Sequence, residues 1–393
     1  MQSLFSSCFF RVVLREVKRI FTNRVYLFFS LLAPLMAYFL MMAIFYKGVP
    51  RDLPVAMVDQ DHTSLSRTIS RMVDATSIAG VDYHCNSIKQ AQDLMEKGEV
   101  EALLVIPSRT ERKVIRGEGS NIALYINNTN VVKGGMLQSG LYKALATVSG
   151  GVKLQVMMKK GASEYQAMEQ VMPIQLDAHA LFNPFVSYSY FLTTGMLPIM
   201  LIVFTLLGSL YALGIELKEG TGRELLEISG DSVVTAITGK LLPYTLFFMV
   251  DAMVMNLILF RFMGTPINGS LTMVILSELL MVITYQLLAV FLLAVTANLR
   301  LSLSLGSAYT MMALTFSGLT FPRFGMPLIA KIFAGMFPFT FWLEIFLGQT
   351  LRGEAVINAV YPMYIFLIFM ALGILSFPKF KRTLQEEKYW GGV

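Results

Sequence analysis

Cysteine and histidine are scarce in this chain of 393 residues. The two cysteines are Cys8 and Cys85, and the three histidines are His62, His84 and His179. The cysteines fall on opposite sides of the first long apolar segment, so they cannot pair, and the histidines lack the close spacing of metal ligands. The sequence therefore predicts neither a disulfide framework nor a metal site.

Charge is also scarce. Only 15% of the residues are charged and 55% are hydrophobic, whereas a soluble domain carries about 25% charged residues. The net charge of +6 would suggest nucleic acid as a partner of a soluble protein. Here the basic residues cluster at the ends of apolar segments, where they act as topology signals. The composition indicates a membrane protein with no nucleic-acid partner.

A phosphate-binding loop is missing as well. Gly239-Lys240 is followed by Leu241 and lacks the upstream glycine of a Gly-x-x-x-x-Gly-Lys-[Ser/Thr] loop, so this chain cannot cradle a triphosphate in that way. No set of nucleophile and base is visible either. We therefore expect no catalytic residue, no bound cofactor and no enzyme activity on this chain.

Long apolar segments are present, and they are unevenly placed. A helix needs about 20 apolar residues to cross the hydrocarbon core. Six segments qualify: Val25–Tyr46, Thr194–Ile215, Leu241–Phe262, Leu271–Thr296, Leu301–Thr320 and Val356–Phe377. The first lacks a cleavage site and is interpreted as an uncleaved signal anchor. The predicted fold class is an α-helical polytopic membrane protein with six transmembrane helices: span 1 at 25–46, and spans 2–6 within 191–377.

Lysine and arginine predict the orientation. One face has the basic residues Arg11, Arg15, Lys18, Arg19, Arg24, Lys218, Arg223, Lys240, Arg300, Lys379, Lys381, Arg382 and Lys388. The short loops of the other face have fewer: Arg261, Arg323, Lys331 and Arg352. We expect both termini, including the tail 378–393, in the cytoplasm of a cell with this chain in its inner membrane, and the polar segment 47–190 outside.

Residues 1–24 are expected to form a cytoplasmic amphipathic elbow helix. Apolar residues such as Phe9, Val12 and Ile20 alternate with basic ones at helical spacing. Such a helix lies flat in the membrane interface. The alternative is a straight extension of the first span, against which Asn23 and the basic cluster indicate a bend.

Periodicity changes after Lys47, where short strands alternate with helices. We expect strands at Leu53–Val58, Val81–His84, Ala102–Ile106 and Ile122–Ile126, and helices at Ser64–Asp74, Ser87–Lys97 and Ser108–Arg116. A long stalk helix at Val131–Gln170 is expected to be broken by Gly150–Gly151 and Gly161. The alternation predicts an inserted α/β extracytoplasmic domain between spans 1 and 2.

Asp59 and Asp61 have the spacing of a paired-carboxylate site. They also follow a strand and precede Thr63, Ser64 and Ser66, as a turn and helix cap would. The cap is the favoured interpretation, and metal binding or acid–base chemistry is the alternative.

Several stretches resemble a known family, the ABC-2 type transporter permeases, in the subgroup with a large extracytoplasmic domain after the first span. The stretches are REVKRIFTNRVYLFFSLLAPLM (Arg15–Met36), LPVAMVDQDHTSLSR (Leu53–Arg67), KQAQDLMEKGEVEALLVIP (Lys89–Pro107), FNPFVSYSYFLTTGMLP (Phe182–Pro198) and ELKEGTGRELLEISG (Glu216–Gly230). The resemblance implies a homodimer or heterodimer of permeases bound to two ABC ATP-binding subunits. ATP and magnesium would then reside on those partner chains.

The charged loop 216–230 is the expected point of coupling to the ATPase. Its two glycines permit a tight turn before an amphipathic helical segment at Arg223–Ile228. The residues expected to carry the coupling are Glu216, Glu219, Gly220, Gly222, Arg223 and Glu224. The alternative is an ordinary charged loop in solvent.

Three polar residues fall inside predicted spans: Asp251, Asn256 and Glu278. A carboxylate at membrane depth is costly, so it should face protein or a water-filled path. One interpretation is a group linked to substrate or proton movement, and the favoured one is a carboxyl group hydrogen-bonded between helices.

A possible substrate path is assigned to aromatic and aliphatic side chains on spans 2 and 5. These are Phe204, Leu207, Tyr211, Tyr309 and Phe316. The apolar segment 321–353 is cut by Pro322, Pro327 and Pro338, so we expect short helices that re-enter from the outer face.

The function expected from these features is the permease subunit of an ATP-driven multidrug-type efflux exporter. It would move hydrophobic or amphipathic molecules such as drugs, peptides or lipid-like compounds, with a periplasmic adaptor protein as a further possible partner. An ATPase-independent membrane scaffold or secretion accessory protein of the same topology is the alternative. A secondary transporter is disfavoured because no inverted repeat is visible.

Overall fold

The computed structural model describes residues 7–46, 48–171, 179, 181–183 and 187–391. The chain divides into two compact units. Unit 1 comprises Met1–Gly48 and Ala180–Val393, and unit 2 comprises Val49–His179.

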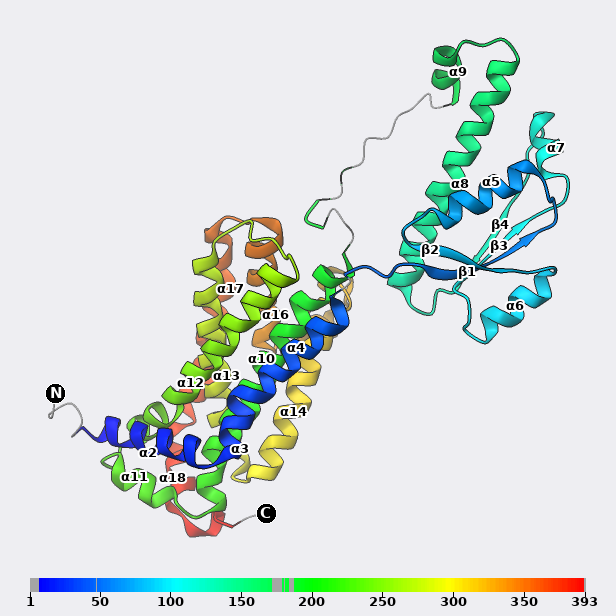
Figure 1. Cartoon of the computed structure of the whole chain (residues 1–393). Coiled ribbons are helices and arrows are strands. Elements are labelled where there is room, and N and C mark those ends of the chain that lie inside the picture. The colour runs from blue at the N-terminus through cyan, green and yellow to red at the C-terminus, as the bar shows by residue number, and fades with distance from the viewer. Residues whose placement is uncertain (1–6, 47, 172–178, 180, 184–186, 392–393) are drawn as a thin grey trace. The chain divides into compact units, whose positions relative to one another are not determined.

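Unit 2 is a four-stranded sheet with helices packed on both faces (Figure 1). Its elements are β1 (Leu53–Asp59), α5 (Ser64–Asp74), β2 (Ala79–His84), α6 (Ile88–Glu96), β3 (Ala102–Ile106), α7 (Thr110–Ile115), β4 (Ala123–Ile126), α8 (Val131–Lys159) and α9 (Glu164–Val171). The strand order is β2-β1-β3-β4. Strand β1 runs parallel to β2 and β3, and β4 is antiparallel to β3.

Apolar side chains of the central strands point alternately to the two faces of this sheet, and helices cover both faces. Val55 and Met57 of β1 face a core that includes Ile69 of α5 and Leu137 of α8. The intervening residues of β1 face a second core, to which Ala91 of α6 belongs. Because both faces are buried, the strands are continuous apolar runs, as is typical of parallel sheets.

Helix α8 differs from the expected broken stalk. It runs without interruption from Val131 to Lys159, through Gly150 and Gly151. Glycine costs a helix roughly 1 kcal/mol relative to alanine, but packing against α5 and the buried Leu137 and Leu141 holds α8 together. The break comes at Gly161, whose positive φ of 95° ends the helix before α9.

Unit 1 is almost entirely helical. Its elements are α2 (Cys8–Thr22), α3 (Arg24–Leu27), η1 (Phe28–Leu32), α4 (Ala33–Phe45), α10 (Tyr188–Lys218), α11 (Gly222–Ile228), α12 (Val233–Leu257), η2 (Ile258–Phe262), α13 (Leu271–Thr296), α14 (Leu299–Phe316), η3 (Arg323–Gly325), α15 (Leu328–Ala334), α16 (Pro338–Leu347), η4 (Gly348–Arg352), α17 (Val356–Leu375), α18 (Phe377–Gln385) and η5 (Glu387–Tyr389). One large apolar core joins its long helices.

Five helical segments of the described chain are long and apolar enough to cross a membrane. They are Arg24–Phe45, Ser189–Lys218, Val233–Phe262, Leu271–Thr296 and Val356–Gln385. A sixth arises if the pair Leu328–Ala334 and Pro338–Arg352, bent by 87°, counts as one broken span. The same bend fits the re-entrant segment expected at 321–353.

The fifth predicted span, Leu301–Thr320, is not among these segments. This segment forms helix α14 at Leu299–Phe316, but α14 is not among the helices that meet the length and hydropathy requirement. Arg300 and a run of serine, glycine and threonine lower its mean hydropathy. The helix packs along α10 and α13, two of the candidate spans, and that it crosses the membrane stays a prediction.

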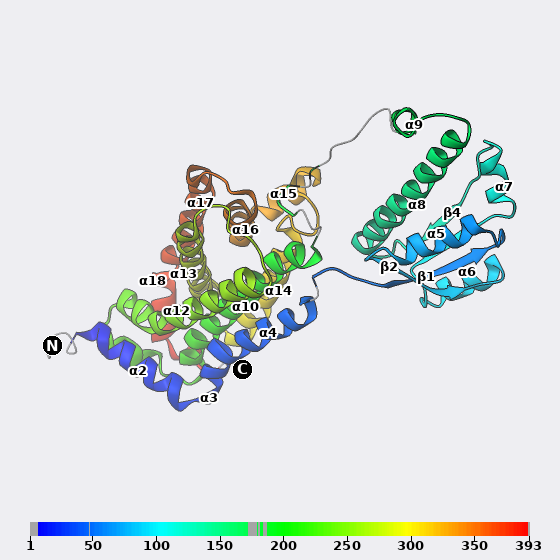
Figure 2. The ribbon, with the colours of Figure 1, turned by 45° about the horizontal axis from the view of Figure 1, so that its top comes forward.

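The amphipathic elbow is bent, as its sequence predicts. Asn23 ends α2 in an extended conformation, with φ −105° and ψ 109°, and its side chain accepts a hydrogen bond from the Val25 N–H at the start of α3. Helices α2, α11 and α18 gather at one end of the helical bundle (Figures 1 and 2).

The stretch Phe182–Pro198, which carries part of the family resemblance, falls partly outside the described residues, because 184–186 are not described. The Asn183 side chain exchanges hydrogen bonds with the Ser187 backbone, at 2.8 and 3.0 Å. These bonds lead the chain into α10, which Ser187 caps.

Candidate functional site

A buried ionic network lies where α2, α10 and α12 meet. Its centre is Glu216, near the end of α10, whose side chain is fully buried. The Arg15 guanidinium donates two parallel hydrogen bonds to this carboxylate, at 2.9 and 3.1 Å. Arg19 and Thr221 also donate to it. Such bidentate, charge-assisted contacts are among the strongest polar interactions in proteins.

Lys240 joins Glu216 to a second buried carboxylate. Its ammonium group lies 2.7 Å from Glu216 Oε1 and 2.6 Å from Glu16 Oε2, and the Lys240 side chain is fully buried. The Tyr244 hydroxyl donates to the other oxygen of Glu16 at 2.7 Å. Three helices are thus held by one set of mutually neutralised charges, since Glu16 belongs to α2, Glu216 to α10 and Lys240 to α12.

The two arginines of α2 remain charged at any ordinary pH. Burial on its own lowers the pKa of Arg15 and Arg19, but the neighbouring carboxylates outweigh it, with Glu216 the strongest of them. The net pKa of each arginine is therefore raised. Arg15 and Arg19 also bond Glu224 and Glu219, at 3.2 and 2.5 Å, which extends the network toward α11.

The predicted coupling residues are divided between this network and the surface. Glu216 is buried at its centre, and Glu219 and Glu224 are half-exposed partners of the arginines. Gly220 adopts a positive φ of 71° and turns the chain into α11. Helix α11 buries Gly222, Leu225 and Leu226 and exposes Arg223, Glu224 and Glu227.

The C-terminal segment packs against the same helix. Arg223 donates to the Gln385 carbonyl at 3.1 Å, forms an ion pair with Glu387 at 2.8 Å, and lies 5.2 Å from the centre of the Trp390 ring. The Gly391 N–H donates to the Leu217 carbonyl at 3.1 Å. Arg223 is therefore engaged within this chain, a contact that neither residue type nor spacing indicated.

Gly222 makes the close approach of α18 possible. A Cβ atom at this position would lie 2.6 Å from the Leu384 carbonyl oxygen and 3.1 Å from its Cα. Because both are backbone atoms, we expect Gly222→Ala to displace the segment 377–391. Amide hydrogen exchange there should accelerate by about tenfold, the scale of a clash worth 1–3 kcal/mol. Gly119→Ala is the control, because its Cβ meets nothing within 4 Å; unchanged exchange in the Gly222 variant would contradict this packing role.

One feature of the sequence indicates this network, namely an acidic residue on the apolar stripe of α2. Val12, Glu16 and Ile20 are four residues apart and all are buried on one stripe of α2. An acidic residue on an apolar stripe requires a buried cation. Lys240, which we counted only as a topology signal, is that cation.

Two of the three polar residues that were predicted inside spans contact each other, and the third does not. Asn256 of α12 donates to Glu278 of α13 at 2.9 Å, so these two side chains connect adjacent helices. Asp251 is fully buried, and neither of its carboxyl oxygens has a hydrogen-bond partner among the described residues. The favoured interpretation, a bond between helices, therefore fits Glu278 and Asn256 but not Asp251.

Comparison with protein families decides the identity of the chain. The model of the family described as "ABC-2 family transporter protein" matches residues 24–377. The chain belongs to the ABC-2 transporter family. Its apolar helices and this membership make it a multi-pass membrane protein and the permease subunit of an ABC transporter. Searches of curated proteins and of solved structures found no match.

The position of Asp251 in this ABC-2 permease leads to a stability prediction. An unpaired carboxyl group inside a membrane protein is costly, so Asp251→Leu should raise the thermal unfolding midpoint by a few degrees, roughly the effect of 1 kcal/mol. Asn256→Leu is the contrasting variant, and it should lower the midpoint because it removes the only side-chain hydrogen-bond donor that the described residues provide for Glu278. A lower midpoint for Asp251→Leu would reveal a partner for this carboxyl group.

The residues assigned to a substrate path all pack half-buried against the main core of the permease. The Tyr211 ring contacts the Tyr26 ring in a tilted arrangement, with ring centres 5.3 Å apart. On α14, Tyr309 and Phe316 both contact the Phe337 ring, and the Tyr309 hydroxyl donates to the Met336 carbonyl at 2.7 Å. Phe204 and Leu207 lie on α10, which packs along α14. That these side chains line a path stays a prediction.

Asp59 and Asp61 of unit 2 are structural residues. Asp59 accepts hydrogen bonds from the Asp61 and His62 N–H groups and from the Ser66 hydroxyl, and Asp61 accepts from the Thr110 and Glu111 N–H groups. Burial alone raises the pKa of Asp59, but these bonds outweigh it and lower the pKa. The turn-and-cap interpretation is confirmed. Among the described residues, no group of three or more histidine, cysteine or acidic side chains is placed to hold a metal ion.

Proposed function

We propose that this ABC-2 permease exports hydrophobic or amphipathic molecules from the cytoplasm or the inner leaflet, driven by a separate ABC ATP-binding subunit. The single observation that carries the proposal is the ionic network of Glu16, Glu216 and Lys240. It ties the segment that leads into α11 to three different helices, so a force applied at α11 is transmitted to all of them.

The proposed coupling surface is the exposed side of α11 together with the adjacent side of α2. Glu224 and Glu227 are exposed on α11, and Arg223 is already neutralised by Glu387. Glu224 shares its charge with Arg15, so the acidic charge that α11 offers to a partner is mainly that of Glu227. We expect the ATP-binding subunit to receive α11 in a groove with basic side chains, since interfaces pair opposite potentials.

In the proposed mechanism, ATP closes the partner subunits and moves α11 as a rigid body. The bidentate Arg15–Glu216 pair and the Lys240 bridge keep α2, α10 and α12 in register during this motion. Packed helices shift as units rather than deform continuously. A homodimer or heterodimer of permeases would then open outward along an interface that includes α10 and α14.

The orientation is proposed from the distribution of basic residues. The elbow, the 216–230 loop and the tail would be cytoplasmic, and unit 2 would be an extracytoplasmic domain available to a periplasmic adaptor protein. Export is favoured because unit 2 would lie on the side to which the substrate is released.

Co-purification from native expression levels tests this function. The full chain is solubilised in detergent and isolated, and the eluate is assayed for ATP hydrolysis and examined for a co-purifying ATP-binding cassette protein. An associated ATPase supports the permease function. An eluate without any ATPase overturns it and favours the membrane scaffold.

A further inference from the structure

Unit 2 has a crevice at the carboxyl ends of its two central strands. The crevice has a volume of about 520 Å³ and is lined by the loops that follow β1 and β3. From β1 the chain passes to β2 on one side, and from β2 it returns to β3 on the other side of β1. In open α/β sheets, ligands bind outside the carboxyl ends of the strands where the strand order reverses in this way.

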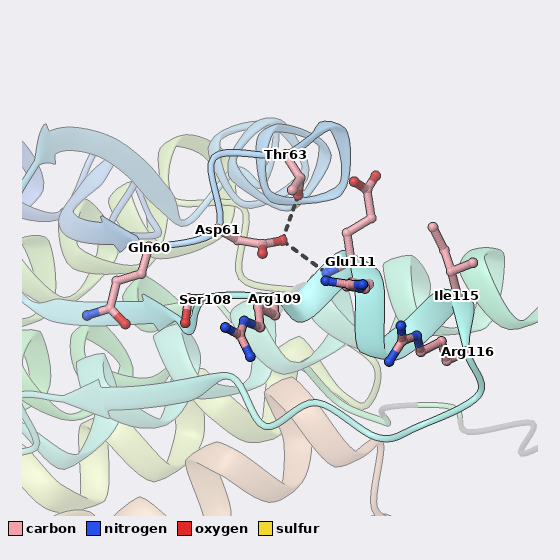
Figure 3. Close-up of a pocket in the computed structure, with 9 residues that line it drawn as sticks. Gln60, Asp61, Thr63, Ser108, Arg109, Glu111, Ile115 and Arg116 are labelled. Atoms are coloured by element: carbon pink, nitrogen blue, oxygen red, sulfur yellow. Dashed lines mark hydrogen bonds between the residues drawn. The ribbon is translucent and has the colours of Figure 1, made fainter.

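The crevice is lined by cations that lack partners. The side chains of Arg109, Arg112 and Arg116 have no hydrogen bond or ion pair with any described residue. Figure 3 shows Arg109 between Ser108 and Arg116, with Gln60 on the other side of Ser108. Three unpaired guanidinium groups repel one another, so this arrangement favours an anion between them.

The acidic residues of the crevice do not neutralise these arginines. Asp61 accepts hydrogen bonds from the Thr63 hydroxyl and from the Thr110 and Glu111 N–H groups. Figure 3 shows its bonds to Thr63 and Glu111. Glu111 accepts from the Ser64 hydroxyl. The guanidinium donors of the three arginines are therefore left without an acceptor among the described residues.

An apolar groove adjoins the crevice between α5, α7 and α8. It has a volume of about 530 Å³ and shares Glu111 and Ile115 with the crevice. Its apolar lining comes from all three helices, namely Leu65, Met72, Val114, Val148, Val152 and Val156. Lys159 and Lys160 add positive charge at the end of α8.

We propose that unit 2 binds an anionic amphiphile. The three arginines hold its acidic headgroup, a phosphate or carboxylate, and the groove between α5, α7 and α8 holds its hydrocarbon chain. The positive charge of the arginines favours an acidic headgroup. Because the crevice and the groove meet at Ile115, one molecule with both a headgroup and a hydrocarbon chain can occupy them together. Each volume falls within the roughly 300–1,000 Å³ of small-molecule sites.

This proposal concerns unit 2 alone and goes beyond export. A small hydrophilic anion would leave the apolar groove unfilled, and an uncharged lipid would leave the arginines unpaired. Binding by unit 2 is expected whether or not an ATPase is attached to the permease.

The test uses the full chain in nanodiscs of zwitterionic lipid. An alkyl phosphate with a diazirine near the end of its chain is photo-cross-linked, and labelled peptides are located by mass spectrometry. We expect labelling of α8 near Val152 and Val156. An alkyl phosphocholine with the same diazirine should label these residues at least about tenfold less, because it lacks net charge for the arginines.

Two variants separate the headgroup from the tail. Arg109→Gln, Arg112→Gln and Arg116→Gln together should reduce labelling at least about tenfold; Arg51→Gln, an exposed arginine elsewhere in unit 2, is the control. Gly151→Leu fills the groove without strain, because a Cβ there meets nothing within 4 Å, and it should reduce labelling equally. Gly135→Leu, an equally open position on the same helix, is its control.

Equal labelling by the two probes, or labelling that neither variant reduces, would overturn the proposal. Loss in the arginine variant alone would also overturn it, because the groove would then hold no chain. Since Gly151→Leu increases helix propensity, its loss of labelling does not arise from unfolding. A failure to find an associated ATPase would affect the exporter function and leave this result unchanged.

Discussion

Lys240→Met will be among the most destabilising single substitutions in this permease. Among the described residues, Lys240 forms the only ion pair with Glu16, and Arg19 acts on this carboxylate at longer range, whereas Glu216 retains ion pairs with Arg15 and Arg19. The variant therefore leaves one buried carboxylate at α2 without an ion pair and with the Tyr244 hydroxyl as its side-chain hydrogen-bond donor. Removal of one partner of a buried pair costs about 3–5 kcal/mol. We expect the thermal unfolding midpoint in detergent to fall by roughly 5–10 °C.

A second substitution, Glu16→Gln, tests whether the stability lost in Lys240→Met is due to the uncompensated charge of Glu16. In the double variant Glu16→Gln with Lys240→Met, no uncompensated charge remains, so most of the lost stability should return. Lys218→Met, on the same helix as Glu216, is the control because Lys218 is exposed. A double variant as unstable as Lys240→Met alone would show that packing of the lysine stem, rather than charge, holds these helices.

The stability that comes from the α2 arginines should not vary across the physiological pH range. A raised pKa means that the folded state binds the proton more tightly, so this contribution is fully present below the ordinary pKa of arginine and is lost only as pH rises through the higher folded value. The pKa values of Arg15 and Arg19 are both raised above the ordinary value of arginine. Between pH 6 and pH 9 neither group titrates.

The sequence predicted the elements of unit 2 well because residues next to each element, such as a helix cap or a proline, set where it begins or ends. Helix α5 and strand β3 have the expected boundaries, since Thr63 caps the one and Pro107 follows the other. Helix α14 shows where local rules end. Its apolar residues predict a membrane span, but it is not among the helices long and apolar enough to count as one. Its contacts with α10 and α13 are not visible in the segment alone.

The candidate site was predicted only in part because its chemistry is long-range. The loop 216–230 was recognisable as a charged turn between two apolar helices. The partners of its residues lie about two hundred positions before it and more than a hundred and sixty after it, as the Arg15–Glu216 and Arg223–Glu387 pairs show. Charge and spacing along one segment carry no information on such pairs, except for the acidic Glu16 on a buried stripe.

The second large effect expected is loss of the ATPase from a permease with an altered α11. Glu224→Arg together with Glu227→Arg reverses the charge of the exposed side of this helix. If a basic groove of the partner receives α11, juxtaposed like charges cost several kcal/mol. The amount of co-purifying ATPase should therefore fall at least about tenfold relative to the unaltered chain, measured as ATP hydrolysis per permease.

Stability provides the check that this loss is specific. Glu224 contributes one half-exposed ion pair with Arg15 at 3.2 Å, which is worth at most about 1 kcal/mol, and Arg15 keeps its two bonds to Glu216. The unfolding midpoint should therefore change little. Glu96→Arg with Glu99→Arg makes the same change of charge on exposed positions of unit 2 and should retain the ATPase. Full co-purification with the α11 variant would mean that the partner does not dock on this helix, and the ionic network beneath α11 would then serve the fold of the permease alone.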